Sequence, residues 1–488
     1  MIQTPALASG LNDFSGSEDI REASVKVNDI HSGLNETEVA EIVVADSLDT
    51  LRKVVKTATA RTGVVAIAGG RHSMGAQQFA SGARLLDTRE MNAVLDLDRE
   101  HGLVEVEAGI QWPELIRVLI EQQAGDERQW SIAQKQTGAD RFTIGGSISA
   151  NAHGRGLAMR PIIGDVESLR LVRPDGTVIT CSRAENAELF YLVIGGYGLF
   201  GAIYSVTLRL TPRQKLERVV QLADADDVTR LFTERIAAGY LYGDFQFAID
   251  PKSEDFLRRG VFSCYRPVAD SVEIPAGQRA LSREDWARLL VFAHTEKTRA
   301  FEEYAAHYLA TSGQVYWSDL HQFADYTDGY HERLDQLLRA AQPASEMISE
   351  LYVPRERLSD FLGDVAEDFR ANDTDVIYGT VRLIERDEES FLAWARQSYA
   401  CVIFNLHVVH TPEGISHSTA AFRRLIDRAR ERGGSYFLTY HRWATSEQIQ
   451  DCYPQFQDFL RLKRDYDPMG LFQSDWYRHH VALLGGQA

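Results

Sequence analysis

A histidine lies in a glycine-rich loop that directly follows a short apolar run. The run occupies residues 64–67, and the loop, residues 68–75, has the sequence A-G-G-R-H-S-M-G with the histidine at position 72. Glycines let backbone N–H groups approach a phosphate with no side chain between them, and a nest of such groups binds anions. A histidine in this loop is therefore placed to touch a bound, phosphate-containing molecule.

A second loop of the same kind follows about 70 residues later. Residues 143–156 read T-I-G-G-S-I-S-A-N-A-H-G-R-G, again rich in glycine and again with a histidine beside a glycine, at position 153. Glycine turns after strands are common, so either loop alone is a weak signal. Two such loops in one N-terminal half suggest a single diphosphate cofactor that is held at two places.

The order of these motifs resembles the vanillyl-alcohol oxidase family of flavoenzymes, which have the p-cresol methylhydroxylase (PCMH) fold. The FAD domain of that family carries a G-x-G-H-S-type loop and then a T-[IV]-G-G…H-G loop. Residues 165–176 resemble the family's next strand and turn, residues 185–190 its helix, and residues 195–203 its closing glycine turn. The resemblance implies an α+β fold: a PCMH-type FAD-binding domain and an α+β substrate cap whose antiparallel sheet is covered by helices.

The resemblance also assigns residues to FAD. His72 matches the histidine that is bonded to the flavin methyl group in cytokinin dehydrogenases and alditol oxidases, so a covalent bond is expected there. Residues 131–156 contain no cysteine, so the second bond of the berberine-bridge subgroup is not expected. His153 and Gly154 are expected near the isoalloxazine. The other residues expected to bind FAD are Gly69, Gly70, Arg71, Ser73, Gln77, Gly138, Thr143, Gly145, Gly146, Ser149 and Ile203.

The candidate base comes from the cap. Residues 349–355, S-E-L-Y-V-P-R, resemble the E-x-[YF]-x-[VL]-P-R segment of alditol oxidases, in which the glutamate contacts the substrate at the flavin. The resemblance gives that role to Glu350, although a solvated glutamate at a strand end would look the same. Oxidation of an alcohol requires loss of the hydroxyl proton, so a base must lie within reach. The candidates are Glu350, Tyr440 and His407, in that order.

Further cap residues are expected to orient the substrate. Arg382 resembles the family's substrate-side arginine, and a surface ion pair is the alternative. Asn405 and His407 alternate on an otherwise apolar strand, which is the pattern of a pocket wall. The C-terminal part resembles decaprenylphosphoryl-ribose oxidases, but Tyr440 stands where those enzymes have a lysine near the flavin. The electrostatic help of that lysine is therefore in doubt.

These residues predict an FAD-dependent oxidoreductase that oxidises a CH–OH group of a small polyol, sugar or lactone. The cofactor carries the redox chemistry, and the protein supplies grip and orientation. The electron acceptor is expected to be O2 or a separate redox carrier. One alternative is oxidation of an amine or of an allylic or benzylic carbon in an aromatic substrate. A flavin-binding protein without turnover is a remote second alternative.

Composition narrows the class of protein. The formal net charge of −18 over 488 residues argues against a nucleic-acid partner, since such binding draws on Lys and Arg. The four cysteines have no C-x-x-C spacing, which fits a reducing compartment, and we expect a cytoplasmic protein. The first 30 residues lack the apolar stretch of a signal peptide, and no apolar run is long enough to span a membrane.

The chain is long enough for two domains. We expect a flexible lead-in at residues 1–25, the FAD-binding domain at 26–215, the cap at 216–444, and a C-terminal segment at 445–488 that returns to the FAD domain. Residues 196–201 satisfy G-x-G-x-x-G, but a helical pattern precedes them and a strand follows, so they do not fit a Rossmann unit. His407 and His410 lie three apart on a strand and point to opposite faces, so no metal site is expected.

Overall fold

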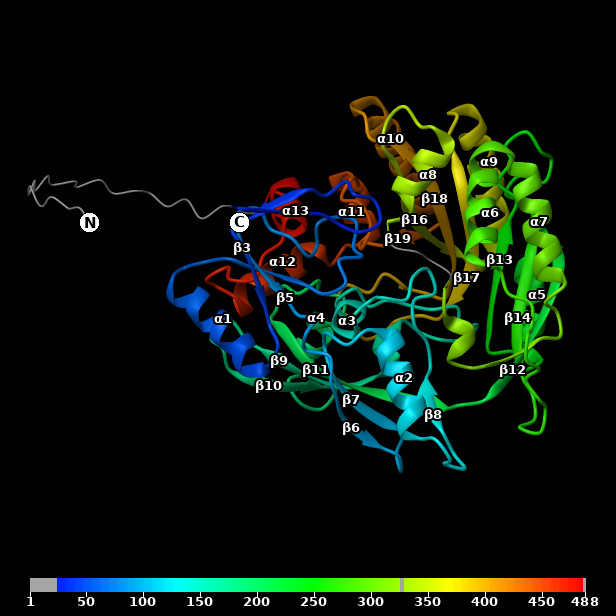
Figure 1. Cartoon of the computed structure of the whole chain (residues 1–488). Coiled ribbons are helices and arrows are strands. Elements are labelled where there is room, and N and C mark those ends of the chain that lie inside the picture. The colour runs from blue at the N-terminus through cyan, green and yellow to red at the C-terminus, as the bar shows by residue number, and fades with distance from the viewer. Residues whose placement is uncertain (1–23, 325–328, 486–488) are drawn as a thin grey trace, which may run out of the picture.

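A computed structural model describes residues 24–324 and 329–485 of the protein. Two units lie side by side: an N-terminal unit that also receives the C-terminal helices, and a second unit built around a long antiparallel sheet (Figure 1). The lead-in expected at residues 1–25 lies outside the described residues except for its last two, and Val25 already belongs to β1 (Val25–Val27).

Three sheets form the N-terminal unit. Strands β3, β5 and β4 make a parallel three-stranded sheet, and β1 pairs with β2. The largest sheet is antiparallel, in the order β10-β9-β11-β7-β6, with β8 paired to β11. The bounds of these strands are β2 (Thr37–Val39), β3 (Glu41–Val44), β4 (Val65–Ala68), β5 (Arg84–Asp87), β6 (Val94–Asp98), β7 (Leu103–Glu107), β8 (Trp130–Ile132), β9 (Val166–Val172), β10 (Val178–Ser182) and β11 (Ala202–Pro212).

The helices of this unit begin where the sequence signals them. Helix α1 (Leu48–Ala60) follows Ser47, whose hydroxyl accepts a hydrogen bond from the backbone N–H of Thr50. Helix α2 (Trp112–Gln122) has a proline in its first turn. Helix α4 (Ala187–Val193) precedes the G-x-G-x-x-G sequence and β11 follows it, which is the reverse of a Rossmann unit.

The second unit, the cap, contains one eight-stranded antiparallel sheet in the order β15-β12-β14-β13-β17-β18-β16-β19. Its strands are β12 (Lys215–Asp224), β13 (Tyr242–Phe247), β14 (Arg259–Pro267), β15 (Val315–Trp317), β16 (Ala344–Pro354), β17 (Val376–Ile384), β18 (Tyr399–Val409) and β19 (Ser435–Tyr436). Its helices are α5 (Ala225–Ala237), α6 (Arg283–Thr295), α7 (Lys297–Leu309), α8 (Tyr330–Leu338), α9 (Leu358–Ala371) and α10 (Pro412–Arg430).

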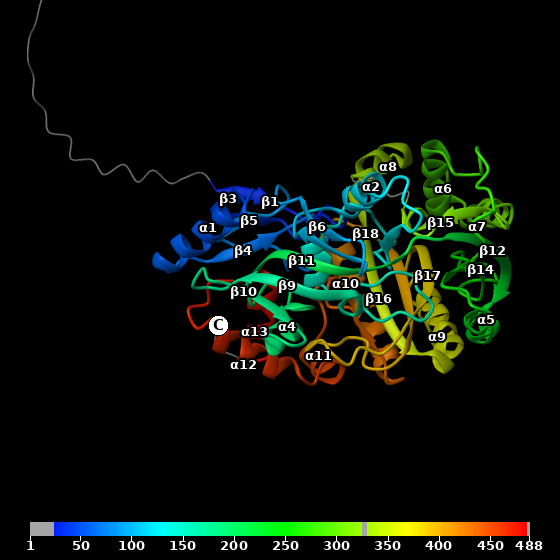
Figure 2. The same cartoon turned by 90° about the horizontal axis from the view of Figure 1, so that it is seen from below.

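Helices cover both faces of the cap sheet. On β14, Phe262 packs against Phe232 of α5, with their ring centroids 4.8 Å apart. The preceding residue, Val261, packs with Ala305 of α7 on the other side of the sheet. Successive residues of a strand point to opposite faces. Helix α5 therefore covers one face and α7 the other, and Figure 2 shows these two helices on opposite sides of the sheet.

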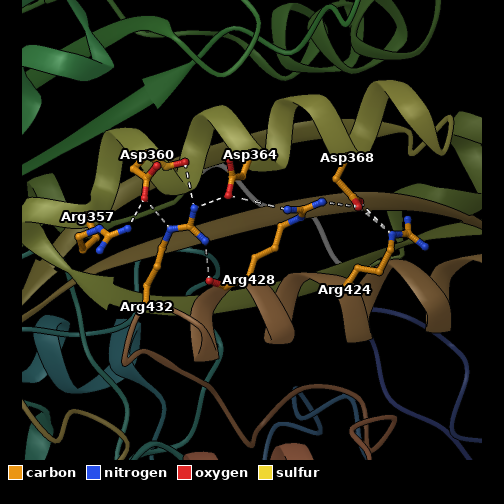
Figure 3. A network of polar contacts seen from close by, with 7 residues as sticks. All are labelled: Arg357, Asp360, Asp364, Asp368, Arg424, Arg428 and Arg432. Carbon is orange, nitrogen blue, oxygen red and sulfur yellow. Dashed lines mark hydrogen bonds and ion pairs between the residues drawn. The ribbon is translucent and has the colours of Figure 1, made fainter.

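An ion-pair ladder lies between helices α9 and α10 of the cap and joins them (Figure 3). Aspartates recur every fourth residue on α9, and arginines recur every fourth residue along α10 and just past its end, so each set lies along one side of its helix. The aspartates are Asp360, Asp364 and Asp368, and the arginines are Arg424, Arg428 and Arg432. Asp368 accepts hydrogen bonds from Arg424 at 2.9 Å and from Arg428 at 3.0 Å. Arg432 donates to Asp360 at 3.1 Å and also pairs with Asp364.

The C-terminal segment crosses back to the N-terminal unit. It contains α11 (Ser446–Cys452), α12 (Phe456–Tyr466) and α13 (Asp475–Leu483). Between the last two helices the chain runs beside β4: Val65 donates to the carbonyl of Leu471 at 2.8 Å and accepts from Gln473 at 3.1 Å. Figure 1 shows these helices, in red, beside the blue strands. The strand before the first glycine-rich loop is thus held in place by the C-terminal segment.

Candidate functional site

The two glycine-rich loops and the cap sheet enclose one large cavity. Its volume is about 1100 Å³, and its walls include both loops, the residue after β19 and the inward faces of β16, β17 and β18. This cavity contains nearly every residue that the sequence nominates. Gly154 and His407 are the two that do not line it.

The first loop is shaped by its contact with the second. A Cβ atom on Gly69 would lie 2.1 Å from Oγ1 of Thr143, and one on Gly70 would lie 2.6 Å from the carbonyl oxygen of Arg141. Neither position has room for a side chain. Arg71 adopts a left-handed backbone conformation (φ 60°) and pairs with buried Asp87 at 3.3 Å. The loops therefore close on each other and leave their polar edges toward the cavity.

His72 is held between a second histidine and a phenyl ring. Its Nδ1 lies 2.8 Å from Nε2 of His31, and its ring centroid is 4.0 Å from that of Phe142. Burial, and then the neighbouring His31, keep the pKa of His72 well below its ordinary value, so the ring is neutral. Its Nε2 is buried and has no hydrogen-bond partner among the described residues.

The second loop contains a short helix, α3 (Ile144–Ser149), which is not evident in the sequence because two of its residues are glycines, which disfavour helices. Thr143 caps it: its hydroxyl accepts from the N–H of Gly146 at 3.2 Å. Gly145 donates to the carbonyl of Ala108 at 2.7 Å, and a Cβ at this position would lie 2.8 Å from Cβ of Ala108. Gly145 is thus required for close packing against the strand behind it.

Glu350 lies at the junction of the two units and is bonded from both. Its Oε1 lies 2.5 Å from Nε2 of His153 in the second loop and accepts from the hydroxyl of Tyr352 at 2.9 Å. Its Oε2 accepts from the hydroxyl of Tyr440 at 3.1 Å. Burial raises the pKa of Glu350, but His153, Tyr352 and the charge of Arg382 outweigh it and hold the pKa below its ordinary value. Glu350 is therefore a buried carboxylate.

The neighbours of His153 fix where its protons lie. Its Nδ1 is 2.9 Å from the carbonyl oxygen of Gly154, which can only accept, so Nδ1 carries a hydrogen. The Nε2 atom faces the carboxylate, so a second proton lies between Nε2 and Oε1 of Glu350. The pair is thus a buried, proton-sharing ion pair that leaves Oε2 of Glu350 with Tyr440 alone.

Two of the other substrate-side candidates lie at this cavity. Arg382 is 8% exposed, lines the cavity, and has no hydrogen-bond partner for its Nε within the described chain. Asn405 also lines it. His407 lies elsewhere: it pairs across the sheet with Glu346, whereas Glu350 pairs with Ile403. The structure therefore separates His407 from the other two candidate bases.

Several remaining candidates of the first loop hold the cap in place. Gln77 donates to the carbonyl of Leu438 at 2.7 Å and accepts from the N–H of Gly75 at 2.8 Å. The hydroxyl of Ser73 lies 3.1 Å from that of Thr439.

The remaining FAD candidates outside the first loop also lie at the cavity. They are Gly138, Ser149 and Ile203, and a Cβ on Gly138 would meet open space.

Sequence reasoning missed a cationic wall of the cavity. Arg155 donates to Asp244 at 3.3 Å, and its guanidinium lies 5.0 Å from the ring centre of Tyr265. Arg218 donates to the hydroxyl of Tyr265 at 2.8 Å. Arg155 belongs to the second loop and could have been nominated, whereas Arg218 stands in a strand with no motif. One buried and one half-buried guanidinium with one nearby carboxylate favour an electron-rich ligand group.

The residues present fit an FAD molecule. Several buried polar atoms around the cavity lack hydrogen-bond partners in the described part of the chain, among them Nε of Arg71, Nε2 of His72, Oγ1 of Thr137 and Nε of Arg155. Buried polar atoms are normally satisfied, so unsatisfied ones at a cavity mark a ligand site.

No helix among the described residues is long and apolar enough to cross a membrane.

This fold and cavity define a two-domain flavoprotein with a PCMH-type FAD-binding domain and a substrate cap. Residues 39–182 match the family model described as an FAD binding domain, and residues 280–480 match the model of D-arabinono-1,4-lactone oxidase. The chain belongs to the FAD-linked oxidoreductases of the vanillyl-alcohol oxidase type, as its motifs predicted.

Individual relatives agree with this assignment. The chain is 34% identical over 150 residues to L-galactono-1,4-lactone dehydrogenase 2, mitochondrial, of Oryza sativa subsp. japonica. This alignment covers 31% of this chain and 24% of that protein. It is 23% identical over 433 residues to decaprenylphosphoryl-beta-D-ribose oxidase of Mycolicibacterium smegmatis, 85% of this chain and 88% of the relative. L-gulonolactone oxidase of Mus musculus is 30% identical over 167 residues, 34% and 36% of the two chains. The first of these alignments spans about a quarter of the relative's length.

Proposed function

We propose that this protein is an FAD-dependent oxidoreductase that oxidises a CH–OH group of a small polyol, sugar or lactone. The observation that carries the proposal is the position of Glu350, a buried carboxylate at the junction of the loops and the cap. Relatives named for lactone and ribose oxidation support the substrate class.

FAD, when bound, supplies the hydride acceptor for this reaction. The two loops would hold its diphosphate and adenosine, and His153 would lie near its isoalloxazine. We further propose that His72 attaches FAD covalently. Its Nε2 is buried, neutral and without a partner in the described chain, so it is free to form a bond.

Glu350 would take up the hydroxyl proton of the substrate. Its Oε2 has one donor, Tyr440, whereas Oε1 is occupied by His153 and Tyr352. Oε2 is therefore the acceptor with spare lone pairs, and Tyr440 fixes its direction. The proton-sharing contact with His153 would keep Glu350 ionised before the reaction. Arg382 and Asn405 would orient the substrate oxygens.

A second candidate is oxidation of an amine or of an allylic or benzylic carbon. Aromatic side chains line part of the cap wall, among them Phe247, Tyr265, Tyr304 and Tyr316, and could sandwich a flat substrate. Cytokinin dehydrogenase 7 of Oryza sativa subsp. japonica is 30% identical over 217 residues, 40% of this chain.

The electron acceptor would be O2 or a separate redox carrier. We also propose a cytoplasmic location, because the four cysteines are free and buried, as in proteins of a reducing compartment.

An anaerobic substrate screen tests the function. Purified protein is mixed with polyols, aldonolactones, aromatic alcohols and amines, and bleaching of the flavin band is followed; air is then admitted. Bleaching by a polyol or lactone, and its loss in Glu350→Gln, is the expected result. Bleaching only by aromatic substrates would favour the second candidate, and none with any substrate class would indicate a flavin-binding protein without turnover. Rapid reoxidation in air identifies an oxidase.

A further inference from the structure

A second cluster of polar side chains lies in the cap, apart from Glu350. Glu346 of β16 stands opposite His407 of β18, and His294 of α6 reaches both. The ligand atoms of these three residues all lie within 4.8 Å of one another. Glu346 and Glu350 share one face of β16, four residues and about 13 Å apart. The cluster is therefore separate from the candidate base.

The polar atoms of this cluster lack partners. Glu346 is 4% exposed, and neither of its carboxylate oxygens has a hydrogen-bond partner within the described residues. The same is true of Nε2 of His294 and Nδ1 of His407, both of which are buried atoms. Burying a carboxylate without a hydrogen bond or a cation is costly. The arrangement calls for a positive centre among these atoms.

The spacing of His294 and Glu346 fits two ligands of one metal ion better than a hydrogen-bonded pair. Nε2 of His294 is 3.5 Å from one oxygen of Glu346, and Nδ1 of His331 is 3.4 Å from the other. Hydrogen bonds between such groups are 2.7–3.2 Å long. Two ligands on a tetrahedral ion with bonds of about 2.1 Å lie about 3.4 Å apart.

A backbone contact orients His294 for this role. Its Nδ1 lies 2.8 Å from the carbonyl oxygen of Leu290, one helical turn earlier, so Nδ1 carries the hydrogen and Nε2 presents its lone pair to the cluster. Histidines that bind metals typically donate their other ring N–H in this way. The nearby charges Lys297 and Asp375 pair with each other at 2.9 Å, so the groups that face the carboxylate of Glu346 are the two histidines, His294 and His331.

We propose that His294, Glu346 and His407 bind a divalent zinc-class ion, with His331 beside the second carboxylate oxygen. Two histidines and one carboxylate are a donor set of zinc sites that keep a fourth position open. Glu346 lines the large cavity, so the open position faces it and can take an oxygen of a ligand held there. His410, the first residue after β18, is no part of the site: its Nε2 lies 2.8 Å from the hydroxyl of Ser345, which is on the opposite face of β16 from Glu346.

Zinc alone tests this site and requires no knowledge of the substrate. Purified holoprotein is stripped with a chelator, its flavin content is checked, and Zn²⁺ is titrated against a competing indicator dye. One zinc per chain, with a rise in melting temperature, is expected. Glu346→Gln and His294→Asn should each weaken binding more than about 100-fold, and His331→Asn about 10- to 100-fold.

His410→Asn is the matched control and should bind zinc as the wild type does. The half-exposed His407 provides a variant, His407→Asn, that keeps the test open if Glu346→Gln does not fold. Absence of zinc binding by stripped wild-type protein, or unchanged affinity in a folded ligand variant, overturns the proposal and leaves an ion pair only. The proposal stands independently of the flavin chemistry, because zinc binding is read out without substrate.

Discussion

Nε2 of His153 lies 2.5 Å from Oε1 of Glu350, so one proton joins the FAD-binding domain to the cap. The two residues are 197 positions apart in the sequence. Each motif can be found by itself, but only the packing of β16 over the second loop makes them partners. The candidate base is therefore assembled by the domain interface, and its ionisation depends on that interface.

Glu350→Gln should slow substrate-driven flavin reduction by about 10² to 10⁴, which is typical for loss of a positioned base. Flavin content and melting temperature should stay close to those of the wild type, because glutamine keeps the size of the side chain. Anaerobic stopped-flow absorbance measures the rate. Ser349→Ala, a neighbour on the other face of β16, is the control. An unchanged rate would transfer the role to Tyr440.

The rate should depend on pH in a defined direction. The pKa of Glu350 is held below its ordinary value of 4.5, so the carboxylate stays ionised as pH falls from about 7 to about 5 and the rate should not drop there. His153→Asn removes the strongest stabilising partner, and burial then raises the pKa. The acid limb of the pH profile should move to higher pH in this variant. Identical profiles would show that His153 does not set the ionisation of Glu350.

His72→Ala should abolish covalent flavin. Wild-type protein precipitated with acid should keep its yellow colour in the pellet, whereas the variant should release FAD or lack it. His101→Ala, on the surface, is a suitable control, since His101 contacts Asp98 far from the loops. Release of all flavin from denatured wild type would refute the covalent bond, although FAD binding itself would stand.

Gly146→Val should lower flavin occupancy. A Cβ at this position would lie 2.9 Å from Oγ1 of Thr143, the atom that caps α3, so the side chain disturbs the loop as well as the approach of the cofactor. Flavin absorbance per protein measures occupancy. Gly363→Ala, within α9 where a Cβ meets open space, should leave occupancy unchanged. Full occupancy in Gly146→Val would exclude the second loop from the FAD site.

Asp368→Ala should destabilise the cap by about 2–3 kcal/mol, because a buried carboxylate that accepts from two guanidiniums is lost. Its side chain is 4% exposed, so solvent screens these pairs weakly. Removing Arg461, whose partners are exposed, should cost less than about 1 kcal/mol. Urea unfolding measures both. Equal costs would show that the ladder between α9 and α10 adds little.

Candidate site residues could be predicted from the sequence where they belong to short local motifs. The glycines around His72 and His153 identified both loops, and the segment around Glu350 identified the base candidate. Partners that come from distant segments were not predictable: His31 precedes His72 by 41 positions and carries no motif. His407 was nominated from strand alternation as a pocket residue. Its neighbours, His294 and Glu346, depend on how α6 crosses β16 and β18, which no local pattern encodes.

The pairing of β4 with residues 471–473 has a consequence for synthesis of the chain. Ser81, just after the first loop, donates to Asp475 across 394 positions of sequence. During translation the first loop emerges early, but the segment that supports it emerges only after the whole cap has been made. The nascent FAD-binding domain therefore lacks one of its walls while the ribosome is still at work. Flavin incorporation should be a late event in biogenesis that follows folding of the cap.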